Sequence, residues 1–164
     1  AASDVYKRQT MSEEEKERYT TEKNEIYKEL LKNMSPADLA PEVKATMDEL
    51  RKRGLKLAIG SSSKNAGFIL GQLGLGDYFD AVSDGNQITR SKPDPEVFLL
   101  AAKLIDEKPE DCLVVEDARA GLAAAKAGGM TGAGIGDAAD CELADYHLRT
   151  FQDLLTATHL SACN

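Results

Sequence analysis

The sequence is short of basic residues and of long apolar runs, and each shortage excludes a class of protein. The 20 lysine and arginine residues stand against 28 aspartate and glutamate residues, which gives a formal net charge of −8. Nucleic acids and anionic membrane surfaces bind basic footprints, so we expect neither as a partner. No apolar stretch is long enough to span a bilayer, and no signal-peptide pattern opens the chain. A small phosphate ligand is still compatible with this charge, because a local lysine and a metal ion can reverse the sign of a pocket.

Cysteine and histidine are also scarce, and neither is spaced as metal ligands usually are. The three cysteines, Cys112, Cys141 and Cys163, are odd in number and include no close pair. This usage is typical of reduced thiols and predicts a cytoplasmic protein. His147 and His159 have no ligand-like neighbours, so we interpret neither as a metal ligand.

The length and the local patterns divide the chain into three parts. At 164 residues it suits one domain, or one domain with a fragment of another. Residues 1–10 lack a clear period, and we set them aside as a non-native or disordered leader. Residues 11–38 have a helical pattern that ends at Ser35-Pro36, because proline disfavours helical geometry in the residue before it. Residues 39–164 form the third part.

In residues 39–164 the pattern alternates between helices and strands. The predicted strands are residues 55–59, 81–82, 113–115, 131–135 and 146–148. Helices are predicted from Pro41, after Asn65, from Asp94, from Ala118 and after a cap made by Thr150 and Asp153. Strands that alternate with helices of about ten residues indicate an α/β fold, with a parallel sheet covered by helices on both faces.

Three polar motifs follow the apolar runs. They are Gly-Ser-Ser-Ser-Lys-Asn at residues 60–65, Ser-Lys-Pro-Asp-Pro at residues 91–95, and the pair Glu116-Asp117. Ligands of open α/β sheets bind beyond the carboxyl ends of the strands, so we expect these motifs on one face. A hydroxyl, a lysine and two carboxylates can together hold a phosphoryl group and a divalent metal ion.

Each motif also has a purely structural interpretation. The serines and Asn65 could simply cap a helix, and the lysine could lie in a solvated surface loop. The adjacent carboxylates are harder to explain in that way, because they repel each other unless a cation joins them. A small cluster of oxygen ligands suits Mg²⁺, which keeps several waters and bridges to a substrate phosphate.

Taken together and in this order, the motifs resemble those of the haloacid dehalogenase superfamily of phosphotransferases. Ser61, Lys92 and the pair Glu116-Asp117 match its second, third and fourth motifs in turn. The segment at residues 60–65 is similar to that of β-phosphoglucomutases, and so are Lys23-Asn24-x-x-Tyr27 and Ser35-Pro-Ala-Asp38. The resemblance implies a three-layer Rossmannoid core in residues 39–164. It also implies a remnant of a helical cap, with its hinge, in residues 11–38.

The resemblance assigns roles to these residues. Asp117 and Glu116 are expected to hold Mg²⁺, Lys92 to balance charge at the transferring phosphoryl group, and Ser61 to bind a phosphoryl oxygen. The implied sugar-phosphate site consists of Lys23, Ser61, Ser62, Ser63, Lys64 and Asn65. The family's first motif, an Asp-x-Asp on the first strand, supplies the nucleophile, and this chain contains no such tripeptide. We therefore expect a core without its first strand, which belongs between residues 55–59 and 113–115, and an inactive chain when it is expressed alone.

The resulting hypothesis is the C-terminal part of a cytoplasmic, monomeric β-phosphoglucomutase. The complete enzyme would interconvert β-glucose 1-phosphate and glucose 6-phosphate through glucose 1,6-bisphosphate, with an aspartyl phosphate formed on the missing segment. One alternative is a sugar-phosphate phosphatase of the same superfamily. The other is a non-catalytic domain that binds phosphate or a partner.

Overall fold

The computed structural model describes residues 34–161, and the chain divides into two units, Ala1–Met34 and Ser35–Asn164. Everything below concerns the second unit. The sequence predictions made for residues 1–33, including Lys23 and the first helix, lie outside the described residues. None of the helices in the described part is both long and apolar enough to cross a bilayer.

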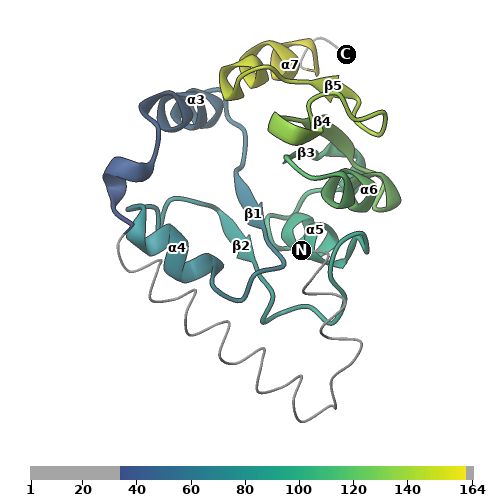
Figure 1. Cartoon of the computed structure of the whole chain (residues 1–164), viewed down its shortest axis with the longest axis horizontal. Helices are drawn as coiled ribbons and strands as arrows, with labels where there is room; N and C mark the ends of the chain where they lie inside the picture. The colour runs from purple at the N-terminus through teal and green to yellow at the C-terminus, as the bar shows by residue number, and fades with distance from the viewer. Residues whose placement is uncertain (1–33, 162–164) are drawn as a thin grey trace. The chain divides into compact units, whose positions relative to one another are not determined.

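Helices and parallel strands alternate along the second unit (Figure 1). The helices are α3 (Pro41–Lys52), α4 (Ala66–Gln72), α5 (Glu96–Leu104), α6 (Arg119–Ala127) and α7 (Leu154–Ser161). The strands are β1 (Ala58–Gly60), β2 (Ala81–Ser83), β3 (Leu113–Glu116), β4 (Thr131–Gly134) and β5 (Tyr146–His147). Short 3₁₀ turns, η1 (Pro36–Asp38), η2 (Pro109–Asp111), η3 (Gly136–Ala138) and η4 (Phe151–Asp153), connect them. The α/β class predicted from the sequence is confirmed.

The strands form two separate parallel ladders. In the first, β1 pairs with β2, and Gly60 lies opposite Ser83. In the second, the order is β3-β4-β5, and Glu116 lies opposite Gly134. Within residues 34–161, β1 and β3 are not hydrogen-bonded to each other. This break falls where the family resemblance places the strand of the first motif.

Three clusters of apolar side chains show that helices cover both faces of the strands. One cluster joins α5 and α6 to β3, with Val97, Phe98, Val114, Ala124 and Ala125 among its buried members. The other two pack α3, α4 and α7 against the opposite face, around Leu50, Leu154, Met47 and Leu70. Along β3 the side chain of Val114 joins the first cluster, whereas Leu113 and Val115 join the second, as expected of alternating residues in a strand. The result is the predicted three-layer arrangement.

The first ladder begins later than the sequence pattern predicts. The predicted strand over residues 55–59 is observed at Ala58–Gly60, and Leu55 is 42% exposed rather than buried. Gly54 has a φ of 89°, and the N–H of Leu55 donates to the carbonyl oxygen of Leu50, so Leu55 still completes the end of α3. The next apolar residue, Leu57, donates its N–H to the Asp80 carboxylate at 2.8 Å rather than to a strand.

The other predicted boundaries hold within one or two residues. Strands predicted at residues 81–82, 113–115, 131–135 and 146–148 are found at Ala81–Ser83, Leu113–Glu116, Thr131–Gly134 and Tyr146–His147. Thr150 and Asp153 form the predicted capping box, although it caps η4, which leads into α7. Asp94 accepts the N–H of Glu96 at 3.0 Å, and α5 begins at Glu96.

Candidate active site

Polar residues lie at the carboxyl ends of β1, β2 and β3, and those at β1 and β3 are ones that the sequence singles out. Ser61 follows β1 directly, Ser83 closes β2, and Glu116 closes β3 and precedes Asp117. The N–H of Ser61 donates to the carbonyl oxygen of Ser83 at 2.9 Å, so the first two strand ends are joined. In α/β sheets this edge is where ligands bind.

The closest charged contact in this region joins the lysine motif to the carboxylate pair. The ammonium group of Lys92 lies 2.5 Å from Oε1 of Glu116, and their side chains are only 18% and 11% exposed. The two residues are 24 positions apart in the chain, so this contact is produced by the fold. Charges removed from water in this way need a partner, and each of these side chains supplies it to the other.

Helix α6 passes directly beneath the Glu116 side chain at Gly121. A Cβ atom added at Gly121 would lie 2.0 Å from Cδ and 2.2 Å from Oε2 of Glu116. Any larger residue would therefore occupy the space of the carboxylate. Glycine lets the helix and the end of β3 approach closely enough to hold that carboxylate from one side, while Lys92 holds it from the other.

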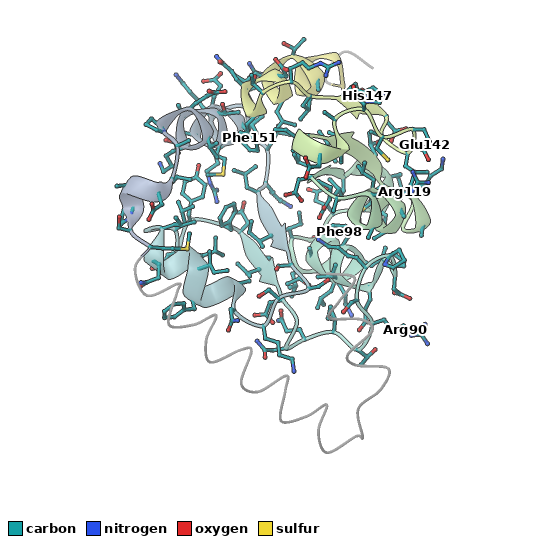
Figure 2. All side chains as sticks on the ribbon, in the orientation of Figure 1. Arg90, Phe98, Arg119, Glu142, His147 and Phe151 are labelled. Carbon is teal, nitrogen blue, oxygen red and sulfur yellow. The ribbon has the colours of Figure 1, made fainter. Side chains whose placement is uncertain are left out.

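An aromatic ring connects the lysine to the end of β1. Phe98, labelled in Figure 2, belongs to α5. A Cβ added at Gly60 would lie 2.6 Å from its ring. The ammonium group of Lys92 lies 4.7 Å from the centroid of the same ring. A cation over an aromatic face is attracted by the ring quadrupole, so Phe98 supports Lys92 while it packs against the strand that leads into Ser61.

The loop that carries Lys92 is held by Glu96, on the first turn of α5. Its carboxylate accepts the N–H of Thr89 at 2.8 Å and the N–H of Arg90 at 2.9 Å. The bond from the Thr89 amide is the main reason that the pKa of Glu96 is lowered, and the Arg90 amide lowers it further. The carbonyl oxygen of Ser91 accepts the N–H of Asp94 at 3.0 Å, and the peptide bond between Lys92 and Pro93 is cis. The loop therefore enters and leaves Lys92 through anchored residues.

The serine motif forms two successive hydroxyl-stabilised turns. Oγ of Ser61 accepts the N–H of Ser63 at 3.1 Å, and Oγ of Ser63 accepts the N–H of Asn65 at 3.0 Å. Asn65 precedes α4 but makes no side-chain cap, so capping by this residue does not explain the motif. Among the described residues, the buried hydroxyls of Ser62 and Ser83 have no hydrogen-bond partner. Buried polar groups of this kind are usually satisfied, and a ligand at the loop is one way to satisfy them.

The carboxylates at the end of β3 fit a small magnesium site. Asp117 is exposed and forms no ion pair with any described residue, whereas Glu116 is held by Lys92. In the described part of the chain, no three side chains of the metal-ligating types gather together. Mg²⁺ commonly takes only one or two carboxylates and completes its shell with water and phosphate oxygens. The donor set present is therefore of the right chemistry, with ligand positions left for water or substrate.

Comparison with known proteins settles the family. A family model described as a haloacid dehalogenase-like hydrolase matches residues 4–129. The chain belongs to the haloacid dehalogenase-like hydrolase family. Enzymes of this superfamily generally depend on Mg²⁺, in agreement with the carboxylate pair at the end of β3.

Several relatives in this family are named for reactions of phosphorylated sugars. The chain is 37% identical over 140 residues to a β-phosphoglucomutase of Bacillus subtilis, which is 85% of this chain and 62% of that protein. It is 33% identical over 117 residues to a phosphorylated carbohydrates phosphatase of Thermotoga maritima, covering 70% of this chain and 51% of that protein. The crystal structure of a β-phosphoglucomutase from Clostridium difficile matches with a TM-score of 0.84 at 29% identity, covering 94% of this chain and 71% of that one. The chain thus spans between half and two thirds of the two curated relatives.

Within this haloacid dehalogenase-like core, the structure brings together most of the residues that the sequence motifs predict. Lys92 and Glu116 touch, Asp117 adjoins them, and the loop of Ser61 is linked to them through Phe98. Lys23 lies outside the described residues. The sequence motifs include neither Phe98 nor Glu96, so the roles of both residues were missed. Their position just after Ser-Lys-Pro-Asp-Pro is the one signal that could have marked them.

Proposed function

We propose that the complete protein transfers a phosphoryl group to and from a sugar phosphate, as a β-phosphoglucomutase does. The observation that supports this most is the Lys92–Glu116 pair beside Asp117, joined through Phe98 to the serine loop. Together these residues supply a partly buried cation, carboxylates and hydroxyls at one end of the strands. Those are the groups that phosphoryl transfer needs, because its catalysis consists mostly of positioning and charge stabilisation.

In this mechanism an aspartate carboxylate attacks phosphorus as the sugar oxygen leaves and takes up a proton. A sugar hydroxyl then attacks the aspartyl phosphate and gives up its proton, which regenerates the carboxylate. The chain contains no Asp-x-Asp tripeptide, so we assign the nucleophile to a segment beyond these 164 residues. Lys92, fixed by Glu116 and Phe98, places its positive charge next to the transferring phosphoryl group. Ser61 donates its hydroxyl proton to a phosphoryl oxygen, since that hydroxyl otherwise only accepts, from the N–H of Ser63.

Asp117 and Glu116 would hold Mg²⁺. When bound, the ion stabilises negative charge on the equatorial phosphoryl oxygens. The role of this chain is to keep the carboxylates in place. Gly121 and Lys92 confine Glu116 from two sides, while Asp117 remains exposed.

The sugar phosphate itself is assigned to residues 60–65, the serine–lysine loop. Ser62, Ser63, Lys64 and Asn65 follow one another in a loop whose turns are fixed by the serine hydroxyls. The unpaired buried hydroxyl of Ser62 supports a polar ligand at this loop. Lys64 is exposed and can reach a second phosphate of the substrate.

A sugar-phosphate phosphatase is the second candidate, because relatives with that name match nearly as well. Besides the Thermotoga protein, the chain is 39% identical over 101 residues to a fructose-1-phosphate phosphatase of Escherichia coli. The same lysine and carboxylates serve both reactions. They differ in whether water or a second sugar hydroxyl accepts the phosphoryl group from the aspartate.

The test is an assay of the protein expressed from its complete reading frame. β-Glucose 1-phosphate, Mg²⁺ and a trace of glucose 1,6-bisphosphate are supplied, and glucose 6-phosphate is read by a coupled dehydrogenase. We expect turnover with the β anomer and none with the α anomer. No glucose 6-phosphate from either anomer, with steady release of inorganic phosphate, would establish the phosphatase instead.

A further inference from the structure

The loop that follows β2 is bonded to the serine–lysine loop that follows β1. The N–H of Gly85 donates to the carbonyl oxygen of Ser63 at 3.0 Å, and Nδ2 of Asn86 donates to the carbonyl oxygen of Lys64 at 3.1 Å. Two successive carbonyl groups of the serine–lysine loop therefore accept hydrogen bonds from the same neighbouring segment. None of the sequence motifs includes either donor.

These two bonds set the orientation of the groups that face a ligand. In a trans peptide the C=O and the following N–H point in opposite directions, because the unit is planar. Holding the carbonyl of Ser63 toward Gly85 therefore turns the N–H of Lys64 to the other side. No described residue accepts that N–H. The bond from Asn86 to the Lys64 carbonyl oxygen also fixes the backbone that carries the Lys64 side chain.

The contact at Gly85 leaves no room for a side chain. A Cβ added there would lie 2.4 Å from the carbonyl oxygen of Ser62 and 3.0 Å from the nitrogen of Lys64. Both are backbone atoms, which cannot swing aside as the end of a flexible side chain can. A substitution at Gly85 must consequently displace the serine–lysine loop.

The neighbouring segment is itself preorganised. The N–H of Asn86 donates to Oδ1 of Asp84 at 2.8 Å, and the N–H of Asp84 donates to Oε1 of Gln87 at 3.0 Å. Beside it lies a hollow of about 430 Å³, which is lined by polar residues that include Ser62, Lys64, Asn86 and Ser91. Gly85 and Asn86 thus form one wall of a polar hollow at the serine–lysine loop.

We propose that Gly85 and Asn86 are positioning residues that hold the serine–lysine loop in the conformation that binds the phosphate of a sugar phosphate. This inference rests on the proposed function and extends it to residues outside the family motifs. They act through the Ser63 and Lys64 peptides and touch no reacting atom.

The experiment compares Asn86→Ala and Gly85→Ala with wild type in the protein expressed from its complete reading frame. Gly71→Ala is the matched control, because a Cβ at Gly71 meets nothing within 4 Å. Binding of glucose 6-phosphate is measured by titration calorimetry, and hydrolysis of p-nitrophenyl phosphate, which has no sugar hydroxyls, is measured alongside. We expect Asn86→Ala to weaken sugar-phosphate binding by about two- to tenfold, as for loss of one hydrogen bond, and Gly85→Ala to weaken it further.

Asn86→Ala should change hydrolysis of the aryl ester by no more than about twofold, and Gly71→Ala should change neither quantity. A general loss of structure would weaken sugar-phosphate binding and aryl-ester hydrolysis together. A loss of binding alone in Asn86→Ala therefore identifies a positioning role. Unchanged binding of the sugar phosphate by Gly85→Ala and Asn86→Ala would overturn the proposed positioning role. Wild-type protein that cleaves the aryl ester but does not bind the sugar phosphate would also overturn it, while leaving a phosphatase function in place. Wild-type protein with neither property contradicts the proposed function itself.

Discussion

Substituting Gly121 by alanine should damage the candidate active site without replacing any of its functional groups. The added Cβ would lie 2.0 Å from Cδ of Glu116, and real Cβ contacts of that kind stay beyond 3.0 Å. The end of the Glu116 side chain must therefore shift by about an ångström or more, and Lys92, which contacts it at 2.5 Å, confines it on the other side. Overpacking of this kind costs about 1–3 kcal/mol.

The change in helix propensity acts in the opposite direction. Replacing glycine by alanine inside a helix usually stabilises it by about 1 kcal/mol. Gly71→Ala in α4 should show that gain alone, because nothing lies within 4 Å of the added methyl group. Gly121→Ala should then be less stable than this control by about 1–3 kcal/mol, which corresponds to roughly 3–10 °C in Tm.

The assay for this prediction combines thermal unfolding with a Mg²⁺ titration of activity. Displacing a carboxylate that supports the metal site should raise the Mg²⁺ concentration needed for half activity by about tenfold or more. Gly71→Ala should leave that concentration unchanged. If Gly121→Ala is as stable as Gly71→Ala and needs no more Mg²⁺, the close packing of α6 against Glu116 is not what positions the carboxylate.

Three further predictions follow from the same contacts. Lys92→Ala should lower kcat far more than it raises KM, because a fixed cation acts in the transition state, and steady-state kinetics showing a change in KM alone would contradict this. Asp117→Ala should lose most activity at any Mg²⁺ concentration, and unaltered metal dependence in that variant would remove it from the metal site. The N–H of Thr89 holds the pKa of Glu96 below its ordinary 4.5, so the stability from this contact is complete above that value and is lost as the pH falls through the lowered pKa. Glu96→Gln should therefore flatten the decline in urea-unfolding stability below about pH 4.5, and an identical decline in both proteins would rule out Glu96 as its source.

Sequence patterns predict the fold well where a local rule determines the structure. Gly54 ends α3 because its positive φ suits glycine, and the strands after residue 80 are found within one or two residues of their predicted bounds. The error at residues 55–57 has a specific cause: the end of α3 and the Asp80 carboxylate take the amides that the apolar pattern assigns to a strand. Such non-local partners leave no periodic trace in the sequence.

The break between the two ladders is a second feature that the sequence periodicity does not predict. Sequence alternation predicts one parallel sheet, yet within the described residues β1 and β3 remain unpaired with each other. Each strand therefore has one edge whose backbone donors and acceptors are open to another strand. The family resemblance, and not the periodicity, identifies this position as the place of the strand that carries the first motif.

The candidate site was predictable as a set of residues but not as a geometry. The motifs name Lys92 and Glu116, and parallel topology brings the loop after β2 and the end of β3 to the same edge of the strands. Phe98 beneath the lysine and Gly85 against the serine loop depend on tertiary contacts between residues that are ordinary in sequence. Their roles became visible only through distances.

The central claim, phosphoryl transfer between positions of a sugar, is tested most directly by following every phosphorus species in one tube. β-Glucose 1-phosphate, Mg²⁺ and a catalytic amount of glucose 1,6-bisphosphate are incubated with the protein from the complete reading frame, and ³¹P NMR spectra are recorded over time. The account predicts that glucose 6-phosphate accumulates well ahead of inorganic phosphate, and that Lys92→Ala slows this conversion. Inorganic phosphate as the main product, with no glucose 6-phosphate formed, would contradict the mutase and leave the phosphatase.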